Sequence, residues 1–519
     1  MKIVTADQMV MIDKHAIDKM GIPALLLMEN AGCQIAKEAF RITKKSRRNK
    51  SIAVFGYKGN NGGDAFVAVR YLKNEHPHID TRLILLCQPD ELKNEALENY
   101  KKIAEFYPDS IIHADTLDKL LETKGFAIRC GLIVDGIFGT GFSGVPKGHV
   151  AEAIFFILGL NKPVLSIDIP SGVNGNTGEA GNLAVKADIT VTLGLPKLGL
   201  IRGLGVELAG KIKVADIGFP DESINSVVSD IECLEHEKMV SLLPIRSENS
   251  HKMTFGHLFV LAGSTGFTGA AVLACESALR AGCGMVTLGC PKSLHDIFEI
   301  KLTEVITKPL CETEDKTLHL DCLQTVFSTM ADRKCNSILV GPGIGKHLST
   351  AELILSLIKE SPYPIVADAD ALNAVASVSA EAFLDRKSEV VITPHPGELS
   401  RLLSVPVAEI QSDRIKYTRD FAMKYGVITI LKGKNTVIAD TNGDIYVNLT
   451  GNSGLAKAGS GDVLAGMVGS FIAQGMKPVN AACGAVYFHG LIADTAIKTL
   501  GKRGLVASDL IKYMPKILK

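Results

Sequence analysis

Short apolar runs, each ending in a turn of glycine or aspartate before a helical stretch, recur along this chain and constrain its fold more than any other feature. Strands that alternate with helices in this way form parallel sheets, because each helix carries the chain back across a face of the sheet. The 49 glycines suit a protein with many tight strand–helix turns. In the first half we expect strands at residues 51–56, 83–87, 132–137, 164–169, 189–193 and 211–217. This half is therefore predicted to be an α/β domain with a doubly wound parallel sheet.

The second half repeats the scheme of a strand followed by a turn, at residues 257–264, 338–345, 365–373 and 391–399. Between the halves the chain turns polar after Pro220, and residues 244–252 are short of apolar side chains. A chain of 519 residues is too long for one ordinary domain. We therefore predict two α/β domains, residues 1–224 and residues 225–519, with a polar connector at the start of the second.

The composition excludes several classes of partner. Lys and Arg together number 56, as do Asp and Glu, so the chain is neutral and lacks bulk attraction to nucleic acid or to an anionic membrane. No run is long and apolar enough for a membrane span, and the first residues lack the apolar core of a secretion signal, so we expect a cytoplasmic protein. The eleven cysteines form no C-x-x-C motif and lie mostly in apolar runs. We expect them to be reduced and buried rather than metal ligands.

A glycine loop follows the strand at residues 51–56, running from Lys58 to Asp64, and a helix is expected from Ala65. This is the layout of a nucleotide site at the carboxyl end of a parallel strand. Asp135 and Asp168 each close a later strand and precede a loop of glycine and serine. A single aspartate at a strand end is usually a turn or helix-cap residue. Two of them, both directed at the ligand crevice, favour a functional site.

In the second half, Gly459-Ser460-Gly461-Asp462 opens an apolar helix. The start of a helix exposes backbone N–H groups and a positive dipole end, which together form an anion site, and the glycines let a phosphate approach closely. Asp462 is either a helix-start residue or a base aimed at a hydroxyl beside the phosphate. A second loop suited to phosphate, residues 432–436, follows a strand. Neither loop is a Walker motif.

These segments carry a resemblance to a known family. Residues 458–462 resemble the G-x-G-D anion hole of ribokinase-like proteins, and the second half as a whole resembles the dehydratase domain of NAD(P)H-hydrate repair enzymes. The motifs N-N-G-G-D at residue 60, D-G-I-F-G-T-G at 135 and D-I-P-S-G at 168 resemble the epimerase domain of the same family. The resemblance implies a Rossmann-like doubly wound domain followed by a ribokinase-like α/β domain. It further implies repair of NADH or NADPH that has gained water on the nicotinamide ring.

For the first domain, the resemblance implies that Asp168 is the acid/base residue of epimerisation. It implies that a potassium ion is held by Asn61, Asp135 and Ser171, and oxygen ligands suit such a hard cation. The residues expected to bind the hydrated nucleotide are Asn60, Asn61, Gly62, Gly63, Asp64, Gly139, Thr140, Gly141, Phe142, Ser143, Gly144, Val145 and Asp168.

For the second domain, the resemblance implies dehydration of the S hydrate with ADP as co-substrate, Mg²⁺ organised by Glu398, and Asp462 as the catalytic base. On spacing alone His395 could be a core histidine, but its place between two prolines favours the mouth of a site. The residues expected around the hydrate are Gly343, His395, Pro396, Gly397, Glu398 and Asp462. Those expected around ADP are Lys432, Gly433, Lys434, Asn435, Thr436, Asn452, Ser453, Gly454, Gly459, Ser460 and Gly461.

Two other functions remain open on the sequence. The second half could be a small-molecule kinase of the hydroxyethylthiazole or vitamin type, because such kinases share the anion hole. The first half could be a binding module of an RNA-decapping scaffold, although both Asp135 and Asp168 are present and basic tracts are absent. The expected small-molecule partners are the hydrated nucleotides and ADP. The resemblance also implies a homo-oligomer.

Overall fold

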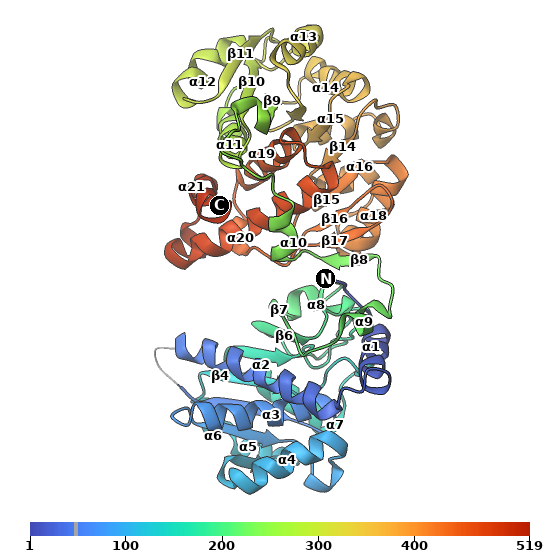
Figure 1. The fold of residues 1–519 in the computed structure, drawn as a ribbon, viewed down its shortest axis with the longest axis vertical. Helices are drawn as coiled ribbons and strands as arrows, with labels where there is room; N and C mark the ends of the chain where they lie inside the picture. Colours follow the sequence, from blue (N-terminus) through green and yellow to red (C-terminus); the bar gives the residue numbers. More distant parts are fainter. Residues whose placement is uncertain (46–49) are drawn as a thin grey trace. The chain divides into compact units, whose positions relative to one another are not determined.

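The computed structural model describes residues 1–45 and 50–519. The chain divides into two compact units, Met1–Ser229 and Asp230–Lys519 (Figure 1). The division falls slightly later than the expected boundary between residues 224 and 225. Residues 225–229 belong with the first unit because they bind its N-terminal segment: Lys2 Nζ donates to the carbonyl of Val227, and Ser229 Oγ donates to that of Ile3.

The described part of residues 1–229 contains one seven-stranded parallel sheet, in the order β3-β2-β1-β4-β5-β6-β7. The strand order reverses between β1 and β4, so the connections after these two strands leave toward opposite faces and open a crevice at the carboxyl edge. The predicted doubly wound sheet is confirmed. Its strands are β1 (Ile52–Gly56), β2 (Thr81–Leu85), β3 (Ile111–His113), β4 (Leu132–Gly136), β5 (Val164–Ile167), β6 (Ile189–Leu193) and β7 (Lys211–Ala215).

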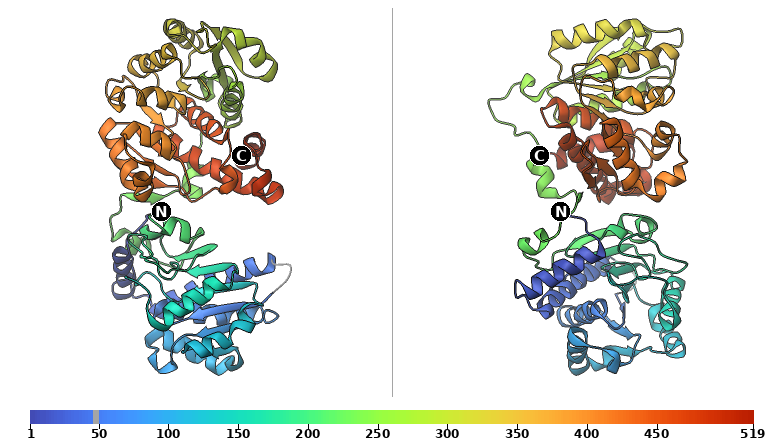
Figure 2. Two further views of the ribbon diagram at one scale, coloured as in Figure 1. Left: turned by 180° about the vertical axis from the view of Figure 1, so that it is seen from behind. Right: turned by 90° about the vertical axis from the view of Figure 1, so that its right-hand side faces the viewer.

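Helices cover both faces of this sheet (Figure 2). On one face Leu27, Phe66 and Tyr100 pack against Val54 and its neighbours. On the other face side chains such as Ile154 pack against Phe55, which lies next to Val54 in the chain. Adjacent strand residues point to opposite faces, so both faces must be apolar, and this explains the continuous apolar runs. The helices are α1 (Ala6–Asp18), α2 (Ala24–Lys45), α3 (Asn60–Glu75), α4 (Asn94–Phe106), α5 (Leu117–Glu122), α6 (Lys124–Ala127), α7 (Gly148–Gly159), α8 (Gly205–Leu208) and α9 (Asp221–Asn225).

The start of α3 differs from the expectation. The helix begins at Asn60, so residues 60–64 form its first turn rather than a loop before it. The preceding Gly59 has a φ of 101°, which reverses the chain directly after β1. A methyl group at Gly62 would lie 1.7 Å from the carbonyl oxygen of Tyr57, so only glycine lets the first turn sit this close to the strand end. The short β3 was also missed, because its three residues are only partly buried or exposed.

Residues 230–519, all of which the structure describes, contain a ten-stranded sheet in the order β11-β10-β9-β12-β13-β14-β15-β16-β17-β8. The sheet is parallel from β11 to β15, and β16 is antiparallel to both of its neighbours. Its strands are β8 (Ile231–Cys233), β9 (His257–Leu261), β10 (Met285–Pro291), β11 (Ile306–Leu310), β12 (Ser337–Val340), β13 (Ile365–Ala367), β14 (Val390–Ile392), β15 (Ile428–Leu431), β16 (Val437–Ala439) and β17 (Ile445–Val447).

Two buried apolar layers flank this second sheet. One holds Met467 and Phe471 of α19, together with residues of α11, α20 and α21, and the other holds Leu353, Phe383 and Phe421. This unit is therefore also a three-layer α/β domain. Its helices are α10 (His236–Ser241), α11 (Thr268–Arg280), α12 (His295–Lys301), α13 (Leu323–Arg333), α14 (Leu348–Glu360), α15 (Asp370–Ala376), α16 (Pro396–Leu403), α17 (Val407–Ser412), α18 (Arg414–Tyr425), α19 (Ser460–Ala473), α20 (Pro478–Gly504) and α21 (Ala507–Ile517).

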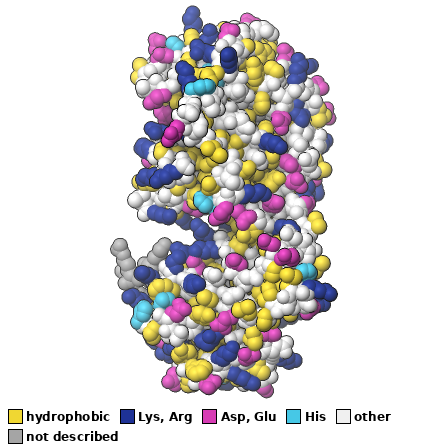
Figure 3. Space-filling model, viewed as in Figure 1, with side chains coloured by type: hydrophobic (Ala, Val, Ile, Leu, Met, Phe, Trp, Pro, Cys, Tyr) yellow, Lys and Arg dark blue, Asp and Glu magenta, His cyan; other side chains and the backbone are white. Residues whose placement is uncertain are grey.

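The distribution of surface charge and the burial of the cysteines are those that the sequence indicates. Acidic and basic side chains are interspersed over the face drawn in Figure 3. Among the described residues no helix has the length and apolar character needed to cross a membrane. All eleven cysteines lie in the described residues and none is joined in a disulfide. Nine of them are buried, Cys33 is half-buried and Cys311 is exposed.

Candidate active sites

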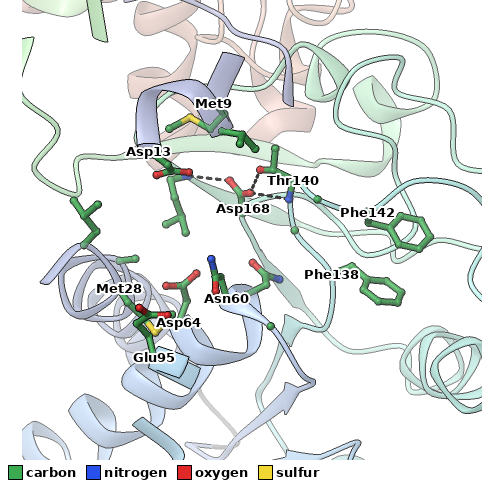
Figure 4. A pocket seen from close by; sticks show the side chains of 18 of the residues that line it. Met9, Asp13, Met28, Asn60, Asp64, Glu95, Phe138, Thr140, Phe142 and Asp168 are labelled. Carbon is green, nitrogen blue, oxygen red and sulfur yellow. Dashed lines mark hydrogen bonds between the residues drawn. The ribbon is translucent and has the colours of Figure 1, made fainter. Parts of the chain in front are cut away.

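A pocket of about 650 Å³ lies in the first unit, at the carboxyl edge where the strand order reverses. Its walls come from the first turn of α3, from the loop after β4, from the end of β5 and from α1 (Figure 4). The helix α1 contributes Met9, Asp13 and Ile17, which are spaced four residues apart and so share one helix face. Elements that are distant in sequence thus meet at the point where α/β sheets bind ligands.

Asp168 lies at the centre of the polar contacts in this pocket. It follows β5 with a φ of 64°, a left-handed conformation that is strained for a residue with a side chain. One carboxylate oxygen accepts hydrogen bonds from the backbone N–H and the hydroxyl of Thr140. The other accepts from Leu193 N at 3.2 Å and from Lys197 Nζ at 2.5 Å. These donors fix the position of the carboxylate and its charge.

Lys197 is almost completely buried, with 1% of its surface exposed. Burial would raise the pKa of Asp168, but the ammonium of Lys197 and the hydrogen bonds from Lys197 and Thr140 outweigh it and lower the pKa below its ordinary value. Asp168 is therefore ionised at neutral pH. Its partner Lys197 also donates to the carbonyl of Leu193, at 2.6 Å.

Two further carboxyl groups face the same lysine, and neither pairs with it directly. Burial raises the pKa of Asp64 well above its ordinary value, and the negative charges of Asp168 and Asp13 add to the effect. Burial also raises the pKa of Asp13, to about 6, against the opposing attraction of Lys197. Three acids thus share one cation, and burial raises the pKa values of Asp13 and Asp64 whereas that of Asp168 is lowered.

A separate polar cluster lies beneath the pocket, around Asp135 at the end of β4. Ser171 donates to Asp135 from its backbone N at 2.9 Å and from its hydroxyl at 2.5 Å, and Ser166 Oγ donates at 2.8 Å. Burial raises the pKa of Asp135, and the hydrogen bonds from Ser171 and Ser166 only partly offset this. Among the described residues no lysine, arginine or histidine pairs with this carboxylate. In the first turn of α3, Asn61 Nδ2 is buried without a hydrogen-bond partner.

In the second unit, the carboxyl ends of β12, β13, β14 and β15 lie side by side at one edge of the sheet. Gly343, Asp368, His395 and Lys432 follow these strands in turn, which places them along that edge. Gly343 has a φ of 59°, and its carbonyl accepts a hydrogen bond from Ser264 Oγ at 2.8 Å. The start of α19 reaches the same edge, because a methyl group at Gly461 would lie 3.4 Å from Lys432 Nζ.

Lys432 is the cation around which this second site is built. Its Nζ lies 2.7 Å from Asp368 Oδ1 and 3.9 Å from Glu398 Oε2. Burial would lower the pKa of Lys432, but the charges of Asp368 and Glu398 outweigh this and raise it. The lysine predicted to contact ADP is therefore already paired with a carboxylate that the sequence places 64 residues away.

The first turn of α19 is open to an anion. Gly459 precedes it with a φ of 88° and offers no side-chain cap to the free N–H groups. The hydroxyl of Ser460 is buried and has no hydrogen-bond partner. Asp462 is the third residue of the helix, so it is not the capping residue itself. Burial and the charge of Asp368 raise the pKa of Asp462 to about 6, in spite of Lys432.

His395 has a structural role that the sequence did not distinguish. Its Nδ1 accepts hydrogen bonds from the backbone N–H groups of Gly397 and Glu398, and Glu398 Oε2 accepts one from the N–H of His395 at 2.7 Å. This reciprocal cap starts α16. The His395 side chain is 51% exposed, so its ring is not a core residue. Burial raises the pKa of Glu398 to about 7.

The chain matches two protein-family models. One is described as NAD(P)H-hydrate dehydratase and covers residues 258–516, and the other is described as YjeF-related protein N-terminus and covers residues 24–199. The bifunctional NAD(P)H-hydrate repair enzyme of Moorella thermoacetica is 36% identical over 522 residues, which span 100% of this chain and 97% of that protein. The chain belongs to the family of bifunctional NAD(P)H-hydrate repair enzymes.

A further relative agrees with this assignment. The repair enzyme of Thermofilum pendens is 34% identical over 100% of this chain and 96% of its own length. Among solved structures, an ADP/ATP-dependent NAD(P)H-hydrate dehydratase from Bacillus subtilis, co-crystallised with ATP and Mg²⁺, is 30% identical with a TM-score of 0.48, and covers 56% of this chain and 98% of that one. The first unit is thus the epimerase domain and the second the dehydratase domain. The kinase and scaffold alternatives find no support in relatives that span the whole chain.

Most of the residues predicted to bind the hydrate in the epimerase domain line the pocket. The pocket is lined by Asn60, Asn61, Asp64, Gly139, Thr140, Gly141, Phe142, Ser143 and Asp168. Gly62, Gly63, Gly144 and Val145 are not part of its lining. Gly62 packs on Tyr57, a methyl group at Gly63 would lie 2.6 Å from Met28, and Val145 is 52% exposed. Ligand contact stays a prediction for all of these residues.

Two residues of the epimerase pocket were missed. Lys197 lies in the segment after β6, as Asp168 lies after β5, and its place after Pro196 was the available signal. Asp13 lies on the same side of α1 as the buried Met9, Ile12 and Ala16, and an acid next to an apolar helix face was the available signal there. Both side chains reach the pocket only through tertiary packing.

In the dehydratase domain the structure brings Asp368, Glu398, Lys432, Gly461 and Asp462 together, as described above. The Asn452 side chain donates to Asp494 of α20 at 2.9 Å, so it anchors the segment that holds Ser453 and Gly454. In the loop after Lys432, Asn435 Nδ2 is buried without a partner. Arg414, which the sequence did not single out, is buried beneath Gly433 and donates to the carbonyl of Leu431 at 2.9 Å.

Proposed function

We propose that the epimerase pocket around Asp168 interconverts the R and S hydrates of NADH and NADPH, and that the site at the start of α19 dehydrates the S hydrate with ADP as phosphoryl donor. The observation that carries this proposal is the presence, in separate units, of two sites that each combine glycine-rich backbone with buried carboxylates around one lysine. Each unit therefore holds the groups for its own reaction.

In the dehydratase site, the N–H groups at the start of α19 bind a phosphate of the nucleotide. Asp462 takes the proton of the ring hydroxyl while the terminal phosphoryl group moves to that oxygen, leaving AMP. Loss of the new phosphate ester as inorganic phosphate, together with a ring proton, restores the double bond of NAD(P)H. A base with a pKa of about 6 is ionised at neutral pH and still accepts a proton.

The residues present fit a divalent cation in this site. Asp368, Glu398 and Asp462 are three buried or half-buried carboxyl groups that all interact electrostatically with Lys432. A second cation would balance their charge, and carboxylate oxygens are the ligands that Mg²⁺ prefers. We infer that Glu398 and Asp368 hold Mg²⁺, which would supply charge neutralisation for the phosphates.

Potassium in the epimerase domain is supported by a similar argument. Asp135 is a fully buried carboxylate without a cationic partner in the described residues, and the hydroxyl of Ser171 adds a neutral oxygen beside it. The side-chain oxygen of Asn61 lies against Gly139, in the loop after β4. An oxygen-only set suits a hard monovalent cation. We infer that these three residues hold K⁺ and that the ion orders the loop after β4 at the pocket.

We predict that ADP supports faster dehydration than ATP, as the sequence resemblance implies. The physical requirement is a terminal phosphate that reaches the open turn at Gly459, and both nucleotides carry one. Initial rates with pure S hydrate, at matched concentrations of Mg²⁺ and of each nucleotide, decide the matter. Faster turnover with ATP would overturn the assignment of ADP as the preferred donor.

A further inference from the structure

We propose that Asp13 is the proton donor of the epimerase site, acting against Asp168 as the proton acceptor. This proposal rests on the proposed epimerisation and names a second residue that performs it. Asp13 is carried by α1, whereas Asp168 follows β5, so the two carboxyl groups enter the pocket from different elements (Figure 4). Within the described residues Asp13 accepts no side-chain or backbone hydrogen bond, which leaves its carboxyl group available to a ligand.

The surroundings of the two aspartates differ in the way that an acid–base pair requires. Asp168 is held ionised by Lys197 and by Thr140. Asp13 faces the same lysine without pairing with it, and burial together with the negative charge of Asp168 raises its pKa to about 6. Two carboxyl groups whose pKa values are pushed apart by their environments are typical of acid–base catalysis in one site.

Other charged groups also face this part of the pocket. Asp64 of α3 interacts electrostatically with Asp13 and Asp168, and burial raises its pKa well above the ordinary value. Lys58 after β1 and Glu95 of α4 also line the pocket. Lys58 is paired with Glu91 at 2.9 Å, which reduces its influence on Asp13. Among these charges Lys197 acts most strongly on Asp13 and lowers its pKa, so the raised pKa of Asp13 comes from burial, with a smaller contribution from the charge of Asp168.

The chemistry of the hydrate requires both a donor and an acceptor. The ring double bond that takes up water is an enamine, so the added hydroxyl sits on the carbon next to the ring nitrogen. The C–O bond breaks with its electron pair on oxygen, Asp13 gives that oxygen a proton, and water leaves as the nitrogen lone pair forms C=N⁺. Water then adds to the opposite face, its lone pair forms the new C–O bond, and its proton passes to Asp168. Asp168 can accept this proton in spite of its low pKa, because a water molecule becomes strongly acidic once it bonds to the positively charged ring.

The test uses the full-length protein with pure R hydrate and no nucleotide, so that the dehydratase site is idle, and chromatography follows the appearance of the S hydrate. Asp13→Asn is expected to lower the rate of S formation by about 10²–10⁴-fold, as for loss of a general acid. Asp13→Glu should restore part of the activity. Asp18→Asn, an exposed aspartate of the same helix, is the matched control and should behave as wild type.

The pH profile separates proton donation from a structural role. The donor must be protonated, so the wild-type rate should fall as pH rises above about 6 and level off below it. Asp13→Asn should lack this limb. A variant that keeps its rate within threefold, or keeps the limb, would exclude Asp13 as the donor. Failure of the wild-type protein itself to form S hydrate would instead overturn the proposed epimerase function.

A different observation points to an oxidation site in the dehydratase domain. Cys311 follows β11 and Cys322 ends a short turn that returns to it, and their sulfur atoms lie 2.9 Å apart. The hairpin between them is closed by His319 N, which donates to the carbonyl of Cys311, and by a bridge between Glu312 and Leu318. We infer that this pair is a site for reversible disulfide formation by peroxides.

The two thiols have different tasks in that reaction. Cys311 is exposed, so it attacks the peroxide, the O–O bond breaks, and a sulfenic acid forms with release of water or an alcohol. Cys322 is buried, and burial raises its pKa to about 12. Its sulfur then attacks that of Cys311, and the hydroxyl leaves with the thiol proton as water. Two thiols lose two electrons in total, and the peroxide gains them.

Peptide mapping tests this site directly. Trypsin cuts at Lys316 and spares Lys308, which precedes proline, so Cys311 and Cys322 fall in peptides 302–316 and 317–333, each with a single cysteine. Peroxide treatment followed by a non-reducing digest should give these two peptides as one linked species that a dithiol separates. Cys322→Ser should abolish the link and leave a sulfenic acid at Cys311 that dimedone traps. If both thiols stay alkylatable under conditions that oxidise the half-buried Cys33, the inference is wrong.

Discussion

Asp462→Asn is expected to slow dehydration of the S hydrate by about 10²–10⁴-fold while ADP affinity stays nearly unchanged. The backbone N–H groups of residues 460–462 survive the substitution, so the phosphate keeps its binding site. The amide cannot take the proton of the ring hydroxyl. Calorimetric ADP binding and the rate of dehydration, measured on the same preparation, separate the two effects.

The helix-start role of Asp462 makes a different prediction. Its carboxylate lies in the first turn of α19 without being the cap, so a purely structural role is worth about 0.3–1 kcal/mol from the helix dipole. The melting temperature would then fall slightly and turnover would survive. Asp296→Asn is the matched control, because Asp296 lies in the first turn of α12 and its side chain is fully exposed. Near-normal turnover of Asp462→Asn would end its assignment as the base.

The pH dependence of the dehydration rate tests the role of Asp462 in a second way. A base must be deprotonated, so the dehydration rate should rise with pH through about 6 and level off above it. The rate of epimerisation, which requires protonated Asp13, should instead fall as pH rises through about 6. One protein should thus show two profiles of opposite slope, measured with pure S hydrate plus ADP and with pure R hydrate alone.

Asp168→Asn is expected to lower the rate of epimerisation by about 10²–10⁴-fold and to leave dehydration of pure S hydrate unchanged. The substitution removes the carboxylate that Thr140, Leu193 and Lys197 hold in the pocket. It also leaves the buried charge of Lys197 without a partner, which costs about 3–5 kcal/mol in comparable pairs. Loss of activity could then reflect an unfolded epimerase domain.

A paired variant removes that ambiguity. Asp168→Asn combined with Lys197→Met takes away both charges and the cost of an unpaired one. We expect this protein to melt closer to the wild type than the single variant does, and to stay inactive toward R hydrate. Circular dichroism melts and the formation of S hydrate are the measurements. Epimerisation at the wild-type rate by the folded double variant would show that Asp168 is not required.

The elements of the fold were largely predictable because their signals are local. A buried parallel strand has to be apolar along its length, and the turn into the next helix needs glycine. The strands at residues 51–56 and 338–345 can therefore be recognised from the sequence alone. The helix start at Gly459 is local in the same sense. The start of α3 was misplaced because it depends on the contact between Gly62 and Tyr57, which no periodicity reveals.

The partners of the site residues were not predictable from the chain. Asp168 meets Lys197 because β5 and β6 are neighbours in the sheet, and Asp368 meets Lys432 because β13 and β15 flank β14. Asp13 enters the pocket because α1 packs over the carboxyl edge. The order of the strands in the sheet determines these contacts, and this order cannot be derived from the spacing of residues along the chain. The sequence therefore located Asp168 and Lys432 but not the groups with which they pair in the folded protein.

The most direct test of the whole account starts from pure R hydrate of NADH, with Mg²⁺ and K⁺ present, and follows the absorbance of the dihydronicotinamide ring. Recovery from the R form requires both activities in sequence. With ADP the absorbance should return completely, and without ADP it should stay flat while S hydrate accumulates. R hydrate that persists in the presence of ADP, although added S hydrate is consumed, would contradict the claim that this one chain performs both reactions.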